Sequence, residues 1–101
     1  MHLIEILLPL FDNDGNRLAP ELYAKVREEL VETFGGLTAF SRSPAEGVWE
    51  EGGERSHDDI VIFEVMSDTL DRAWWRRFRE RLESAFRQDE IVVRAREVER
   101  L

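Results

Sequence analysis

Apolar residues recur at strand or helix spacing in six separate segments of the chain. The first segment, Leu3 to Phe11, would be largely apolar on both faces of an extended strand, as in the centre of a sheet. A turn rich in Asp and Asn follows, and Pro20 then suits the first position of a helix, where its missing N–H is no loss. Apolar residues at helical spacing continue to Phe34, and Gly35-Gly36 predicts the end of this helix.

The second half of the chain predicts two strands, a helix and a final strand. Leu37 to Ser41 begins the second strand, and Asp59 to Met66 alternates in the manner of a third. Ser67 or Asp68 is predicted to cap the second helix, which carries a broad apolar stripe. Ile91 to Val98 is predicted as the last strand. The residues of the stripe are Leu70, Trp74, Trp75, Phe78, Leu82, Ala85 and Phe86.

The order strand, helix, strand, strand, helix, strand favours one topology. Both helices connect strands through crossovers, and right-handed crossovers place them on the same side of one sheet. The sequence therefore predicts an α+β fold, the ferredoxin-like βαββαβ sandwich, with a four-stranded antiparallel sheet and two helices on one face. Its usual strand order puts the first and third strands in the centre, and these are the most apolar strands here. The length suits a single domain over residues 1–101.

One layer of helices leaves the other face of the sheet open, so the composition of that face is informative. Strand alternation predicts that it carries Leu3, Glu5, Leu7, Ile60, Ile62, Glu64, Met66, Val92, Arg94 and Arg96. About half of these residues are apolar, which is more than a water-facing sheet normally carries. We therefore expect a second copy of the chain, giving a homodimer, or a ligand to cover the face. The alternative is that the Glu50–Asp59 hairpin or the chain ends fold over it.

Three charged residues of the open face are candidate ligand contacts. Glu5, Glu64 and Arg94 can meet there, either as a structural network that fixes the register of an interface or as the polar wall of a pocket. Trp49 lies in the region of the second strand and is the aromatic residue that best fits the lining of such a pocket. A small-molecule ligand is therefore one expected partner.

His57 is a further candidate because it is followed by two aspartates. In an extended chain His57 and Asp59 point the same way, so they can ligate a metal or share a proton. A metal site usually needs a third protein ligand, and His2 is the only other histidine. The competing interpretation is a solvated turn, and we assign neither a metal nor a catalytic residue.

Trp74-Trp75 is a second unusual pair, at the margins of the apolar stripe of the second helix. These side chains are predicted to be core anchors, with Arg77 and Arg81 near Trp74. The alternative is an aromatic and cationic wall for an anionic ligand.

Composition excludes several classes of function. The net charge of −8 argues against a nucleic-acid partner, because affinity for the phosphate backbone comes largely from cations. The absence of cysteine excludes disulfides and thiolate metal sites. The first apolar stretch is interrupted by Glu5 and Pro9 and is too short to span a bilayer, so no membrane partner is expected and the cytoplasm is the default location. No phosphate-binding loop or hydrolase motif is present, so no cofactor is expected.

Three short segments carry a resemblance to known proteins. Gly36-Leu37-Thr38, Gly47-Val48-Trp49 and Phe86-Arg87-Gln88-Asp89-Glu90-Ile91 resemble a family of small uncharacterised bacterial domains of ferredoxin-like type. The resemblance implies the fold and little else. More distantly, the architecture is similar to the dimeric α+β barrel proteins, which include small monooxygenases and haem-degrading enzymes. The histidines and asparagines of this chain lie outside its predicted helices, which departs from the pattern of those enzymes.

The sequence therefore favours a non-catalytic binding or interaction module that dimerises through its open sheet face. The alternative is a small cofactor-free enzyme of the dimeric α+β barrel type, acting on a modest organic substrate, with Trp49, His57 and Glu64 as candidates. Whether the chain is an enzyme stays open at this point.

Overall fold

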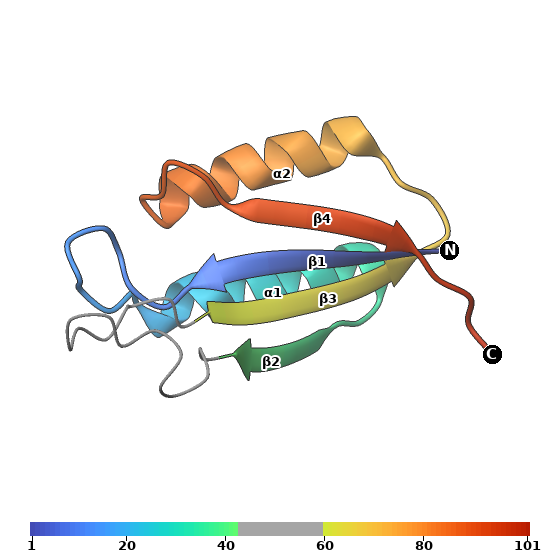
Figure 1. The fold of residues 1–101 in the computed structure, drawn as a ribbon, viewed down its shortest axis with the longest axis horizontal. Helices are drawn as coiled ribbons and strands as arrows, with labels where there is room; N and C mark the ends of the chain where they lie inside the picture. The colour runs from blue at the N-terminus through green and yellow to red at the C-terminus, as the bar shows by residue number, and fades with distance from the viewer. Residues whose placement is uncertain (43–59) are drawn as a thin grey trace, which may run out of the picture.

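The computed structural model describes residues 1–42 and 60–101 (Figure 1). Six elements follow one another: β1 (His2–Pro9), α1 (Pro20–Phe34), β2 (Thr38–Arg42), β3 (Ile60–Ser67), α2 (Arg72–Ala85) and β4 (Val92–Glu97). The strands form a four-stranded antiparallel sheet in the order β2-β3-β1-β4. The first and third strands are central, as predicted.

Both helices lie on the same side of the sheet. Figure 1 shows α1 behind β1 and β3, while α2 runs alongside β4. Ile4, Ile6 and Leu8 alternate along β1, face the helices, and are at most 1% exposed. They pack in one core with buried side chains of both helices and of β3: Tyr23, Val26, Leu30, Phe63, Val65, Trp75, Phe78 and Leu82. The ferredoxin-like fold predicted from the sequence is confirmed.

Helix α1 has the bounds that its sequence predicts. Pro20 occupies the start of the helix, and Ala19 is an N-cap in extended conformation without a side-chain hydrogen bond. Gly35 ends the helix in the left-handed region, with φ of 85°, and its N–H donates to the carbonyl of Val31. A residue with a Cβ would be strained in that conformation, so glycine is required at the stop.

Helix α2 begins later than the sequence predicts. Its N-cap is Asp71, whose Oδ1 accepts a hydrogen bond from the N–H of Trp74 at 3.1 Å. The prediction that Ser67 or Asp68 caps the helix was wrong. Strand β3 continues through Ser67, and the chain needs the following residues to turn from the sheet into the helix layer. The first free N–H groups of the helix therefore lie near Asp71.

The tryptophan pair belongs to an aromatic cluster between the two helices. Trp75 is 7% exposed and stacks on Phe34 with ring centroids 5.2 Å apart. Trp74 is half-buried and stacks on Phe78 at 5.0 Å. Edge-to-face contacts join the two stacks. Both tryptophans therefore anchor α2 to the rest of the core.

Two polar contacts fix the positions of the helices. Arg81 of α2 donates from Nη1 and Nη2 to the carboxylate of Glu29 on α1, at 3.0 and 2.9 Å. The bidentate hydrogen bond raises the pKa of Arg81. On the other side of the core, the hydroxyl of Tyr23 donates to the carbonyl of Pro9, which joins α1 to the end of β1.

Candidate functional site

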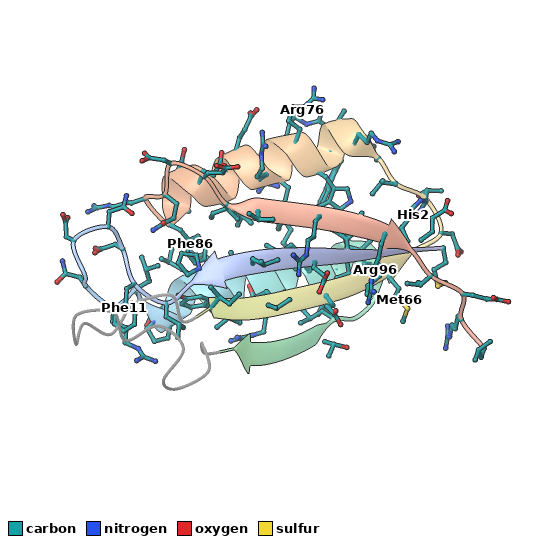
Figure 2. The ribbon with its side chains drawn as sticks, viewed as in Figure 1. His2, Phe11, Met66, Arg76, Phe86 and Arg96 are labelled. Atoms are coloured by element: carbon teal, nitrogen blue, oxygen red, sulfur yellow. The ribbon has the colours of Figure 1, made fainter. Side chains whose placement is uncertain are left out.

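The open face of the sheet, opposite the helices, carries three rows of side chains across β4, β1 and β3. In one row Leu7 lies between Val92 and Ile62, and in another Leu3 lies between Arg96 and Met66. Figure 2 shows Arg96 and Met66 near the same end of this face. Met66 and Val92 are 49% and 44% exposed, so the face presents apolar surface.

The middle row holds the charged residues. Glu5 on β1 lies opposite Glu64 on β3 and opposite Arg94 on β4. Arg94 Nε donates to Glu5 Oε1 at 3.1 Å. The Glu5 side chain is only 15% exposed, whereas that of Arg94 is 52% exposed. The three charged residues that the sequence analysis singled out are therefore neighbours in one row; that they bind a ligand stays a prediction.

Glu5 and Glu64 form an acid pair, and the positive charge near Glu64 is too weak to keep its pKa at the ordinary value. Burial raises the pKa of Glu64, and the hydrogen bond to the Glu5 carboxyl and the Glu5 charge raise it further. The positive charge of Arg96 acts in the opposite direction and does not outweigh them. The Glu64 carboxyl therefore keeps its proton to a higher pH than an isolated glutamate would. A carboxyl group in this state can donate a proton to a bound molecule.

A hollow adjoins the acid pair at the end of the sheet. Its volume is about 460 Å³, and it lies between the open face and the turn that follows α1. Leu3, Leu37 and Met66 give it apolar walls, and Glu64 and Arg100 are its charged residues. An apolar hollow with a few polar groups is the usual form of a small-molecule site.

Two of the predicted site residues, Trp49 and His57, lie outside the described residues, as does the whole of the predicted Glu50–Asp59 hairpin. In the described part of the chain, no group of three or more His, Asp or Glu side chains is arranged to hold a metal ion. None of the helices described is long and apolar enough to cross a membrane.

The structure adds a feature that the sequence analysis missed. A groove of about 210 Å³ lies between α2 and β4, and Arg72, Arg76 and Arg79 of α2 line it. These arginines are spaced i, i+4 and i+7, so the sequence shows that they share one side of a helix. Recognising the groove also requires the knowledge that this side lies next to β4.

Fold and site together define the class: a ferredoxin-like α+β domain with an acid pair on the face of its sheet opposite the helices. No protein-family model and no curated protein matches the sequence. Among solved structures, the chain is similar to a phage SAM lyase in complex with S-methyl-5′-thioadenosine. The TM-score is 0.59 at 15% identity, over 95% of this chain and 80% of that one. The similarity is one of fold.

Proposed function

We propose that the chain is a binding module that assembles with a second copy of itself through the open face of the sheet. The observation that carries this proposal is the charge pattern of the face. Arg94 and Glu64 lie in the same row, one strand away from Glu5 on either side. A two-fold axis running along β1, between two facing sheets, would bring Arg94 of each copy over Glu64 of the other.

The same axis also relates the row around Leu7 to itself. Val92 and Ile62 flank Leu7 in the way that Arg94 and Glu64 flank Glu5, so the exposed Val92 of each copy would lie over the apolar position of Ile62, which is itself 1% exposed. Facing sheets pack with their strands within about 30° of each other, so residues that the axis places opposite one another would stay close to that position. Across this axis Arg94 would face Glu64 and Val92 would face an apolar position, and these are the self-complementary contacts that an interface between identical copies requires.

The acid pair supports the same conclusion. In a single chain Arg94 is bonded to Glu5, and Glu64 retains a raised pKa. A second arginine placed over Glu64 by a partner copy would supply the missing positive charge. Removing water from such charges favours association only where opposite charges meet, and the two-fold arrangement would place one Arg94 over each Glu64.

The size of the face is adequate for a stable contact. The four strands have eight, five, eight and six residues, which at about 3.3 Å per residue and about 4.8 Å between strands gives roughly 430 Å² in plan. Stable interfaces bury about 800 Å² per partner, and projecting side chains give a face more accessible area than its plan. The open face is therefore of the right order.

Val92→Glu tests this proposal. Val92 is 44% exposed on the open face, so a glutamate there leaves the core intact but places a charge in the interface. Val31→Glu is the matched control, because Val31 is 45% exposed on α1, away from the sheet. Ile62→Glu is a poor choice, because Ile62 is 1% exposed and the substitution would bury a carboxylate.

Sedimentation velocity and native mass spectrometry read out the result. We expect a dimer for the original chain and for Val31→Glu, and a monomer for Val92→Glu with unchanged circular dichroism. A monomeric original chain, or a Val92→Glu variant of unchanged mass, would refute assembly through the open face.

A second candidate function is an enzyme of the dimeric α+β barrel type that acts on a small organic substrate in the hollow beside Glu64. The raised pKa of Glu64 favours it, because a proton kept on the carboxyl is available for general acid catalysis. The phage SAM lyase of similar fold binds S-methyl-5′-thioadenosine, so this compound and SAM are reasonable first probes. Binding observed by NMR titration, and lost in Glu64→Gln but retained in Glu32→Gln, would place this candidate first.

A further inference from the structure

The groove between α2 and β4, called the arginine groove below, combines an apolar floor with a cationic rim. Its floor contains Leu70 and Trp75 together with Val93 and Ala95 of β4. Its charged residues are arginines from two elements: Arg72, Arg76, Arg79 and Arg94. Among the described residues that line it there is no acid. In a chain with a net charge of −8, such a concentration of positive charge is unexpected.

Local acids neutralise only part of this rim: Arg94 is paired with Glu5, and Arg79 lies at the limit of a pair with Glu83. Arg72 and Arg76 are exposed and form no ion pair with any described residue. Arg79 Nε is buried without a hydrogen-bond acceptor, and Glu83 Oε2 lies 4.0 Å away, too far for a hydrogen bond. That Glu83 oxygen already accepts from the N–H of Ile91 at 2.9 Å. Arg72 and Arg76 therefore offer charged donors that no described acid engages.

The arginines are also placed against the preferences of the helix. Arg72 is the first residue of α2, where the helix dipole disfavours a cation. Arg72 and Arg76 are four residues apart, so their like charges repel along the same side of the helix. Figure 2 shows Arg76 projecting from α2 at the edge of the molecule. An anion bound between these side chains would relieve both effects.

We propose that the arginine groove binds a small organic oxyanion, a phosphate or carboxylate whose apolar part packs against Trp75 and Leu70. Guanidinium groups bind such oxyanions through paired hydrogen bonds, and Arg72 and Arg76 present exposed guanidinium groups beside the groove. The volume of about 210 Å³ is below the roughly 300–1,000 Å³ of pockets for drug-sized ligands. The ligand is accordingly a small molecule, not a polymer.

This site is separate from the open face. Arg72, Arg76 and Arg79 come from α2, on the helix side of the sheet, and Arg94 alone is shared with the acid pair. Arg72, Arg76 and Arg79 take no part in the proposed dimer contact, so variants at these three positions should leave the oligomeric mass unchanged.

Phenyl phosphate is the first probe, titrated into the isotope-labelled chain at low salt and followed by the NMR signals of the arginine Nε–H groups. Benzoate carries the carboxylate on the same apolar body, inorganic phosphate lacks that body, and phenol lacks the charge. We expect phenyl phosphate or benzoate to bind more tightly than inorganic phosphate, and phenol not to bind.

Arg76→Gln and Arg72→Gln test the residues. Each removes one charge-assisted contact, so we expect affinity to fall about tenfold. Arg77→Gln is the matched control, because Arg77 neighbours Arg76 on α2 but does not line the groove, and the net charge changes equally. Equal weakening by Arg77→Gln would mean unspecific attraction and would overturn the proposal. The proposal would also be overturned if phenol bound as strongly as phenyl phosphate. It would be overturned as well if neither phenyl phosphate nor benzoate bound at millimolar concentration.

Discussion

Glu5 and Glu64 lie directly opposite one another on adjacent strands, and Arg94 is hydrogen-bonded to Glu5. Like charges opposite each other in a sheet destabilise it. Burial of the Glu64 carboxyl, then the hydrogen bond to Glu5 and the Glu5 charge, raise the pKa of Glu64, so this group keeps its proton to a higher pH than in the unfolded chain. The acid pair therefore destabilises the single chain when both carboxyl groups are ionised at neutral pH. A positive charge brought by a partner or ligand would offset this loss of stability.

The first prediction concerns the pH dependence of that weakness. Because the pKa of Glu64 is raised on folding, the folded state binds the proton more tightly than the unfolded state. The free energy of unfolding therefore falls as pH rises from the ordinary pKa of 4.5 through the folded pKa. Glu64→Gln removes this loss, and we expect it to stabilise the fold at neutral pH by about 0.2–1 kcal/mol.

Urea denaturation measures the change in the free energy of unfolding. All samples need the same protein concentration, because any self-association makes the apparent stability depend on concentration. The gain from Glu64→Gln should vanish at a pH below 4.5, where both states are protonated. Glu32→Gln on the exposed side of α1 should give no pH-dependent gain. A gain for Glu64→Gln that is equal at neutral and acid pH would contradict the assigned cause.

The open face could be predicted from the sequence because two strong rules fix it. The period of two in a strand determines which side chains share a face, and the βαββαβ order determines which strands are neighbours. Glu5, Glu64 and Arg94 could thus be placed together without coordinates. The near-complete burial of Ile62 could not, because alternation assigns a face but does not reveal how much neighbouring side chains cover it.

The start of α2 and the arginine groove escaped prediction for another reason. Ser67, Asp68 and Asp71 are all chemically able to cap a helix, and the choice depends on where β3 ends. The groove depends on the rotation of α2 about its axis relative to β4. Both are decided by tertiary packing, which local sequence constrains only weakly.

The second prediction tests the corrected cap. Asp71→Ala removes the hydrogen bond from the N–H of Trp74 to Asp71 Oδ1, and should lower the free energy of unfolding by about 1 kcal/mol. Asp68→Ala should have a much smaller effect, because Asp68 is exposed and lies before the helix. Thermal denaturation of the two variants compares them directly. A larger loss for Asp68→Ala would restore the cap expected from the sequence.

The third prediction concerns the core. Phe86 is fully buried, and its ring meets that of Tyr23 edge to face with centroids 5.3 Å apart. Phe86→Ala should cost about 3–5 kcal/mol through lost contacts and a cavity. Phe86→Leu should cost less and keep a measurable fold if the alanine variant does not fold. Leu101→Ala, at the exposed chain end, should leave stability unchanged in chemical denaturation.

The last prediction concerns the clamp between the helices. Arg81 and Glu29 form a bidentate pair, but their side chains are 61% and 33% exposed, so solvent screens the attraction. A double-mutant cycle with alanine at both positions should give a coupling energy of about 0.5–1 kcal/mol, smaller at high salt. The cycle is needed because Arg81 also lies over the ring of Phe78 at 5.4 Å, so its single substitution removes two contacts. The looser Arg79–Glu83 pair, at 4.0 Å, should couple more weakly in a parallel cycle. A salt-independent coupling, or a stronger one for Arg79–Glu83, would show that the bidentate geometry does not set the strength of the clamp.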